Sequence, residues 1–242
     1  MVSAVTWLGH STVLIEAGGL RLLTDPVLRP RVAHLTRRAP AVDPAGLGPL
    51  DAVLLSHVHR DHLDVPTLRA VGAHVPVVAP PGAAALVGGN HVVHELAPGQ
   101  EMELAGVPIR ATPAFHQVRR RFRDVAALGF VAGESVYFAG DTDVFDEMTE
   151  LGPVDAALLP VWGWGTSLGP GHMDPRAAAH AAALIRPRTA VPIHWGTYFP
   201  AYMGLRGHPL LRDPPHDFAR LVDEESPEIR AVVPAIGERL EV

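Results

Sequence analysis

The chain has 242 residues and a net charge of −6, and 48% of its residues are hydrophobic against 19% charged. This composition is typical of a folded globular protein and excludes a disordered chain. There is no cysteine, which excludes disulfides, thiolate metal sites and cysteine nucleophiles. The acidic net charge argues against general nucleic-acid binding, because that function normally needs a basic surface.

The N-terminal residues lack the basic segment and long apolar stretch of a signal peptide, and no apolar run approaches the roughly 18 residues of a membrane-spanning helix. Together with the missing cysteines, this predicts a cytoplasmic protein without a transmembrane segment. No change in composition marks a linker, so we expect a single domain over residues 1–242. The expected partner is a small-molecule substrate and not a nucleic acid, and the sequence is compatible with a homo-oligomer.

The N-terminal part of the chain is predicted to form an antiparallel meander. Apolar and β-branched residues predict strands at 2–8, 12–16 and 20–24, with glycines in the turns between them. A segment rich in Pro, Arg and Gly follows over 27–49 and shows little periodicity. Because long structureless segments inside a compact domain are usually functional, we expect a functional loop or lid here.

The rest of the chain alternates between strand and helix patterns. Strands are predicted at 51–56, 75–79, 91–96, 101–104, 107–113, 128–132, 136–139, 154–160, 189–193, 229–233 and 239–242, and helices at 66–71, 82–87, 176–185 and 215–224. Asp174 and Pro175 are a typical helix start, whereas 198–214 shows no clear structure. This order favours an α+β protein, an αββα sandwich of two mixed β-sheets flanked by helices.

Three histidines and a carboxylate follow the buried strand at 51–56. Alternate residues of an extended segment point the same way, so His57 and His59 can face one point in space. If the chain then turns into a helix, Asp61 and His62 can face a second point close to the first. Imidazole and carboxylate suit zinc, with manganese and iron as alternatives, so this segment predicts a metal site.

Three further strands end in a residue of the same kind. These residues are His116, Asp141 and His194, and each would be weak evidence alone. Together with the first cluster they give five histidines and two carboxylates, enough for two metal sites of three protein ligands and a shared bridge. Catalytic zinc typically has three protein ligands and an open position for water.

In this order and spacing, the motifs resemble those of the metallo-β-lactamase superfamily. The resemblance implies one metal held by His57, His59 and His116, a second held by Asp61, His62 and His194, and a bridge formed by Asp141. It also implies the αββα sandwich, two divalent metal ions (Zn²⁺ first, Mn²⁺ or Fe²⁺ as alternatives) and a hydroxide that bridges them as nucleophile.

Departures from the superfamily motifs argue strongly against two of its branches. Zinc β-lactamases commonly carry a cysteine where this chain has Asp141, and flavodiiron reductases have an acidic residue where it has His59. The segments 7–16, 24–28, 171–175 and 194–197 resemble a different branch. That branch contains the N-acyl-phosphatidylethanolamine-hydrolysing phospholipase D and the L-ascorbate-6-phosphate lactonase.

Two residues are expected to support the ligands, and two to act in catalysis. Ligating histidines usually donate their second ring N–H to a carboxylate or carbonyl, a role that suits Asp25, and His10 is expected to support the site from the same side. Asp61 is expected to orient the hydroxide as well as to bind metal. The resemblance suggests that His172 contacts the substrate or protonates the leaving group.

The expected substrate contacts lie beside the ligands. Arg119 and Arg121 follow His116 and carry the forked donors that recognise phosphate or carboxylate. Trp162 flanks a ligand-bearing strand end and is expected at the mouth of a pocket. His172, at a helix start, is expected to contact a substrate anion.

These residues predict a metal-dependent hydrolase of a phosphodiester, or of a lactone or ester, with a small anionic substrate. The phosphodiesterase hypothesis is slightly ahead of the lactonase hypothesis. Three alternatives stay open: a nucleic-acid-processing nuclease, a mononuclear iron oxygenase that uses His57, His59, His116 and Asp141, and a non-enzymatic sensor of a metal or metabolite.

Overall fold

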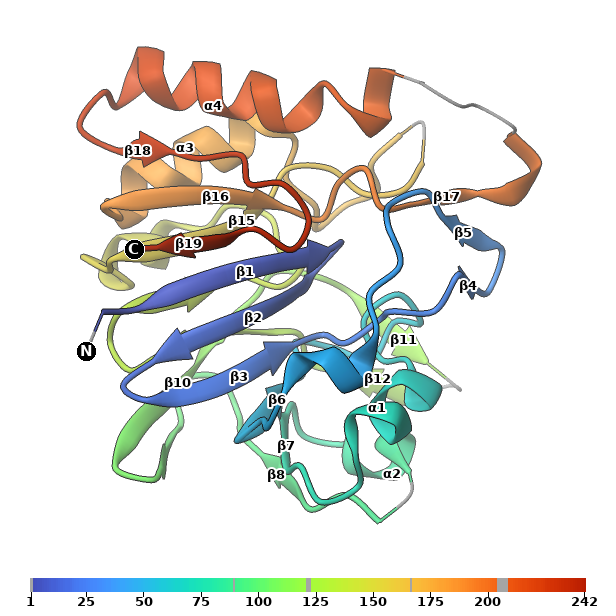
Figure 1. Ribbon diagram of the computed structural model, residues 1–242. Coiled ribbons are helices and arrows are strands. Elements are labelled where there is room, and N and C mark those ends of the chain that lie inside the picture. Colours follow the sequence, from blue (N-terminus) through green and yellow to red (C-terminus); the bar gives the residue numbers. More distant parts are fainter. Residues whose placement is uncertain (1, 89, 121–122, 166, 204–208) are drawn as a thin grey trace.

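The computed structural model consists of two seven-stranded mixed sheets packed face to face, with helices on their outer faces (Figure 1). It describes residues 2–88, 90–120, 123–165, 167–203 and 209–242. The predicted αββα sandwich is therefore confirmed.

The first sheet has the strand order β19-β1-β2-β3-β6-β7-β8. Its strands are β1 (Ala4–Gly9), β2 (Thr12–Ala17), β3 (Leu20–Thr24), β6 (Ala52–Leu54), β7 (Val77–Ala79), β8 (Val93–Glu95) and β19 (Arg239–Glu241). β1, β2 and β3 form the expected antiparallel meander, and β3, β6, β7 and β8 run parallel. The helices α1 (Val65–Val71) and α2 (Ala84–Val87) cover its outer face, where Leu68 and Val87 pack against Leu55 and Val77.

The second sheet has the strand order β18-β16-β15-β14-β13-β10-β9. Its strands are β9 (Glu101–Leu104), β10 (Val107–Pro113), β13 (Leu128–Ala132), β14 (Val136–Phe138), β15 (Ala156–Pro160), β16 (Thr189–Ile193) and β18 (Arg230–Ala231). The helices α3 (Pro175–Ile185) and α4 (Pro214–Glu225) and the 3₁₀ helix η2 (Asp146–Glu150) pack on its outer face. The side chain of Asp174 accepts a hydrogen bond from Ala177 N, so Asp174 caps α3 as predicted.

The core between the sheets is built by the alternation of side chains along the strands. Ile15 and Leu54 of the first sheet pack in one buried cluster with Phe130, Phe138 and Leu158 of the second. All five side chains are fully buried. This packing fixes the strand ends of both sheets relative to each other, and the loops that carry the histidines leave from these ends.

The segments 27–49 and 198–214, expected to be structureless, contain regular structure. β4 (Arg31–Val32), β5 (Leu35–Arg37) and β17 (Tyr198–Pro200) form a three-stranded sheet in the order β17-β5-β4, which we call the roof. The same segments hold the 3₁₀ helices η1 (Pro44–Leu47), η3 (Ala201–Met203) and η4 (Pro209–Leu211). The expectation of loops was wrong because strands of two or three residues leave no periodic pattern.

The roof is anchored to the rest of the protein. Arg29 makes a forked pair of hydrogen bonds to Asp64, with Nε–Oδ2 and Nη2–Oδ1 distances of 2.8 and 2.6 Å. Arg37 Nη2 donates to the carbonyl oxygen of Leu8 over 2.6 Å. The hydroxyl of Tyr198 donates to the carbonyl oxygen of Arg29 over 2.7 Å. These bonds make the segment a fixed wall of the molecule.

Two smaller features complete the fold. β11 (Val118–Arg120) and β12 (Arg123–Val125) form a hairpin directly after His116. None of the helices in the described part of the chain has the length and apolar character that a membrane span requires.

Candidate metal centre

The histidine and aspartate side chains converge at one edge of the sandwich. His57 to His62 follow β6, and His116, Asp141 and His194 follow β10, β14 and β16. Their side-chain nitrogen and oxygen atoms form overlapping groups in which all atoms lie within 4.8 Å of one another. The structure therefore brings together all seven residues that the sequence singled out.

Three histidines form one group, which we call the outer site: His57, His59 and His116. His59 Nδ1 lies 3.1 Å from His57 Nε2 and 3.1 Å from His116 Nε2. His57 is buried, whereas His59 and His116 are partly exposed. The outer site therefore has a side open to solvent.

Asp61, His62 and His194 form the second group, which we call the inner site. His62 Nε2 lies 3.2 Å from His194 Nε2 and 4.0 Å from Asp61 Oδ2. The side chains of His62 and His194 are at most 1% exposed, and that of Asp61 is 15% exposed. The inner site is thus almost sealed from solvent.

Asp141 lies between the two sites. Its Oδ2 is 3.1 Å from His62 Nε2 and 4.0 Å from His57 Nε2, and its Oδ1 is 3.2 Å from His194 Nε2. The side chain is only 2% exposed, and Oδ1 has no hydrogen-bond partner in the described part of the chain. A buried carboxylate oxygen facing imidazole nitrogens in this way is well suited to bind a cation.

Carbonyl groups fix the protons of two of these histidines. His194 Nδ1 donates to the carbonyl oxygen of Trp162 over 2.6 Å, and His116 Nδ1 donates to that of Gly171 over 2.9 Å. Because a carbonyl oxygen only accepts hydrogen bonds, both rings carry their proton on Nδ1. In the neutral form of each ring, Nε2 is then left with a lone pair directed toward its site.

Asp25 fixes the protons of two further ligand histidines, His57 and His62. Its Oδ2 accepts hydrogen bonds from His62 Nδ1 over 2.7 Å and from the Ser56 hydroxyl over 2.5 Å. Since the Ser56 proton is donated to Asp25, its oxygen is free to accept the Nδ1 proton of His57, which is 2.9 Å away. In their neutral form, His57 and His62 therefore also direct Nε2 lone pairs inward, a donor set that fits two divalent metals.

Burial and charge act differently on the two sites. Burial lowers the pKa of His57 well below its ordinary value and the pKa of His116 to about 4. Burial also lowers the pKa of His62, but Asp141 and Asp25 outweigh it and raise that pKa well above its ordinary value. The outer imidazoles thus favour the neutral form that binds metal, whereas the inner site is dominated by its carboxylates.

The backbone is strained at three positions around the centre. His10, Asp25 and His194 have φ angles of 53°, 33° and 62°, in the left-handed region that non-glycine residues rarely adopt. Each is buried and hydrogen-bonded, so the surrounding structure holds it in this conformation. Such strain is concentrated at functional sites.

A comparison with known proteins identifies the family. Residues 20–195 match the Beta-lactamase superfamily domain. The chain belongs to the metallo-β-lactamase superfamily. Within this superfamily, it is 34% identical to a UPF0173 metal-dependent hydrolase of Opitutus terrae, over 98% of this chain and 99% of that protein. It is therefore a member of that metal-dependent hydrolase family.

Solved structures of other metalloproteins share the fold. The metallo hydrolase Igni18 of Ignicoccus hospitalis superposes with a TM-score of 0.77 at 24% identity, over 100% of this chain and 99% of that one. CmlA, a diiron β-hydroxylase of Streptomyces venezuelae, superposes with a TM-score of 0.73 at 19% identity, over 100% of this chain and 54% of that one. Proteins of this fold therefore carry out different reactions, hydrolysis in one case and hydroxylation in the other.

The two residues expected to support the ligands lie beside the inner site of this superfamily member. Asp25 accepts the hydrogen bond from His62 that the sequence predicts for such a residue. His10 Nε2 lies 3.3 Å from Asp61 Oδ2. His10 therefore contacts a carboxylate of the inner site, and Asp25 contacts an imidazole.

The residues predicted to contact substrate are placed unevenly. His172 Nε2 lies 3.5 Å from Asp141 Oδ2, and its Nδ1 donates to the carbonyl oxygen of Gly169 over 3.1 Å. The backbone carbonyl of Trp162 accepts the hydrogen bond from His194 Nδ1, and the indole N–H of Trp162 donates to the carbonyl oxygen of Gly165. Arg121 and the side chain of Arg119 lie outside the described residues.

Sequence reasoning missed two residues that hold the outer site. Ser56 links His57 to Asp25, and the carbonyl of Gly171 accepts the proton of His116. The position of Ser56, directly before His57 at the end of a buried strand, was a usable signal. A backbone carbonyl leaves no such signal, although the glycine at 171 does mark a special conformation.

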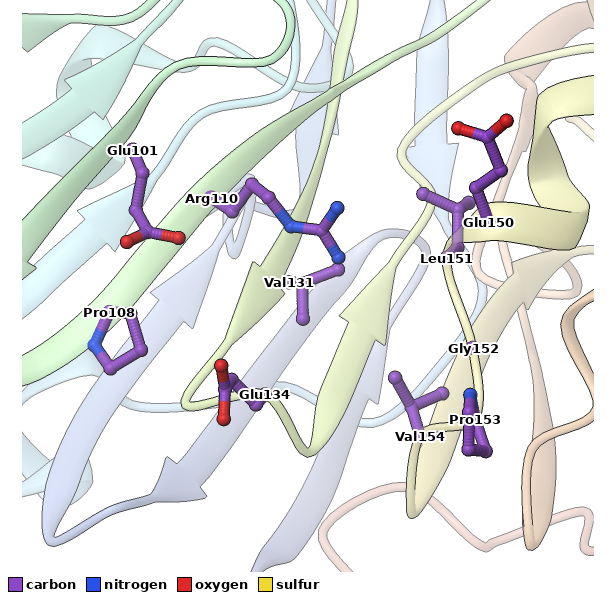
Figure 2. Close-up of a pocket in the computed structure, with 10 residues that line it drawn as sticks. All are labelled: Glu101, Pro108, Arg110, Val131, Glu134, Glu150, Leu151, Gly152, Pro153 and Val154. Atoms are coloured by element: carbon purple, nitrogen blue, oxygen red, sulfur yellow. The ribbon is translucent and has the colours of Figure 1, made fainter.

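A surface cavity of about 340 Å³ lies on the second sheet and contains none of these residues (Figure 2). Its lining includes Arg110, which Figure 2 shows between the carboxylates of Glu101, Glu134 and Glu150. Glu101 and Arg110 belong to β9 and β10, Glu134 follows β13, and Glu150 ends η2. The cavity is therefore separate from the metal centre.

Proposed function

We propose that this protein is a dinuclear metal-dependent hydrolase, with Zn²⁺ as the preferred metal, acting through one domain over residues 1–242. One observation carries the proposal. Four imidazole rings donate a hydrogen bond from Nδ1 to an oxygen atom and direct Nε2 at one of two neighbouring points: His57, His62, His116 and His194. Asp141 lies between the two points. His59 faces the outer point with Nδ1 instead. This donor set suits zinc or a similar divalent ion.

When bound, two such ions would lower the pKa of a water between them and polarise the bond under attack. The chain supplies the remaining functions. Asp61, at the inner site, accepts a hydrogen bond from the attacking water and so orients it. The hydrogen bonds to Asp25, Trp162 and Gly171 keep the ligand rings in the tautomer that binds metal.

Substrate reaches the centre from the outer side. Among the histidines of the cluster, His59, His116 and His172 are partly exposed, whereas His62 and His194 are sealed. His172 carries a proton on Nδ1, because that nitrogen donates to Gly169 O. When His172 is also protonated on Nε2, it can give that proton to the leaving oxygen.

The proposed substrate is a phosphodiester, or a lactone or ester, of a small anionic molecule, as in the phospholipase D and lactonase branch that the motifs resemble. Arg119 and Arg121, close to His116 in sequence, would supply the forked donors for the anion. A phosphodiester is slightly favoured over a lactone. Trp162 would border the leaving group.

The test is metal-dependent turnover of bis-p-nitrophenyl phosphate and of a lactone panel. We expect turnover after loading with Zn²⁺, abolished by Asp61→Ala and unchanged by Asp223→Ala, which removes an exposed carboxylate of α4. Elemental analysis of protein purified without added metal would report the native ion. Full metal loading without hydrolysis of any of these substrates would overturn the proposal.

A further inference from the structure

His10 is a buried histidine that is held on several sides beside the inner site. Its backbone N–H donates to Thr197 Oγ1 over 2.7 Å, and its carbonyl oxygen accepts hydrogen bonds from Trp7 Nε1 and His194 N, both over 2.9 Å. Its ring lies against that of His194, with centroids 3.9 Å apart, and edge-on to Tyr198. This side chain has little freedom to move, and its strained backbone angle is kept by these contacts.

Asp61 depends on His10 for its orientation. His10 Nε2 lies 3.3 Å from Asp61 Oδ2, and within the described residues no other group makes a hydrogen bond to this carboxylate. His62 Nε2 is 4.0 Å from the same Oδ2 and belongs to the same proposed metal site. Without His10, the carboxylate would be free to rotate about its χ2 angle.

The surroundings of the two ring nitrogens decide the tautomer of His10. Nδ1 is buried and has no partner in the described part of the chain. A proton on Nδ1 would leave a buried N–H donor unsatisfied and would point the Nε2 lone pair at a carboxylate oxygen. A proton on Nε2 gives that carboxylate a donor and leaves only an acceptor unsatisfied at Nδ1, so this tautomer is favoured.

We propose that His10 is a positioning residue, whose Nε2–H holds the Asp61 carboxylate in the orientation that completes the inner site. His10 is then not itself a metal ligand, although its nitrogen falls within the same group of atoms as Asp61, His62 and His194. The inference deepens the proposed function, because it specifies how one ligand of the inner site is oriented.

The direct test is nitrogen NMR on protein with ¹⁵N-labelled histidine, first metal-free and then loaded with ¹¹³Cd²⁺. We expect His10 to carry its proton on Nε2 in both states and to show no cadmium–nitrogen coupling. The ligand histidines should show that coupling, through Nδ1 in His59 and through Nε2 in the others. A proton on Nδ1 of His10, or a coupling to its Nε2, would overturn the inference.

Two substitutions separate positioning from packing. His10→Phe keeps a ring against His194 but removes the donor, whereas His10→Gln keeps an N–H at about the reach of Nε2. Zn²⁺ titration against a chromophoric chelator should show inner-site affinity reduced about 10–100-fold in His10→Phe and largely restored in His10→Gln. Equal affinity in His10→Phe and the unmodified protein would contradict the positioning role.

The outcomes also distinguish this inference from the proposed function. The tautomer and the cadmium couplings are measured without any substrate, and the wild-type protein is sufficient for both. If no substrate is hydrolysed but His10 keeps its proton on Nε2, the proposed function fails and the positioning role stands. If hydrolysis is found but His10 couples to cadmium, the positioning role fails alone.

Discussion

The inner and outer sites use the same kinds of ligand but are built differently. The inner site has its own carboxylate, Asp61, and its His62 is held by a further, fully buried carboxylate, Asp25. The outer site consists of three imidazoles, of which His116 is held by a neutral backbone carbonyl. Asp141 lies between the two sites and faces ligands of both.

This difference sets the expected order of metal binding. A divalent cation gains more from a sealed site with carboxylates than from a half-open site of neutral imidazoles, because charges interact more strongly away from water. We therefore expect the first metal to fill the inner site. The outer site, which faces solvent, is expected to exchange its metal more readily and to meet the substrate.

The largest expected effect comes from Asp25→Asn, which changes a residue that supports histidines of both sites. An amide cannot accept hydrogen bonds from His62, the Ser56 hydroxyl and the Ser56 N–H together, because one of its two polar atoms is a donor. We expect metal affinity to fall about 10–100-fold at both sites in a chelator-competition titration.

Ser56→Ala is the matched control for this prediction. It removes the link to His57 of the outer site but leaves the bond from His62 to Asp25 in place. Its effect should therefore fall mainly on the outer site. If both variants weakened metal binding at the two sites to the same extent, Asp25 would not support the inner site independently of Ser56.

Much of this centre is encoded in local sequence. The apolar run 52–55 predicted a buried strand just before His57, and the structure has β6 there. As expected from alternation, His57 and His59 face one point, and Asp61 and His62 face another. The two sheets and their helices also followed from apolar runs of ordinary length. Both features depend on neighbours in the sequence, which is why they could be predicted.

The parts that could not be predicted depend on long-range or backbone interactions. The roof pairs Leu35 to Arg37 with Tyr198 to Pro200, so neither strand can be recognised alone. The acceptors for His116 and His194 are main-chain carbonyls, which every residue carries. The positive φ of His194 runs against residue preference and is imposed by tertiary contacts.

Gly171→Ala should affect the outer site alone. Gly171 has a φ of +79°, and a Cβ there would lie 2.8 Å from Phe115 O and 2.9 Å from His116 Nδ1. The added methyl group would displace the ring of His116, with a strain of about 1–2 kcal/mol in the left-handed region. We expect outer-site affinity to fall about tenfold, in the same chelator titration, with the inner site unchanged.

The control for that variant is Gly169→Ala, since a Cβ at Gly169 would meet nothing within 4 Å. The same loop is altered, but His116 is left in place. Loss of the inner metal in Gly171→Ala, or an equal loss in Gly169→Ala, would show that the effect does not arise from the contact between Gly171 and His116.

The smallest effect is expected from Tyr198→Phe, which weakens the roof beside the inner site. The hydroxyl of buried Tyr198 lies 2.7 Å from Arg29 O and 3.2 Å from Val27 O, and its ring packs edge-on against His10. Removing the hydroxyl should lower the free energy of unfolding by about 1 kcal/mol in a denaturant titration. Tyr202→Phe, at a side chain that is 78% exposed, should leave the free energy of unfolding unchanged.

Tyr198→Phe is also expected to change the rate of metal release. Because the aromatic ring at position 198 remains, inner-site affinity should hold while the inner metal is released faster to a chelator. If the metal of the outer site were released faster instead, the roof would shield the outer site and not the inner site, contrary to this prediction.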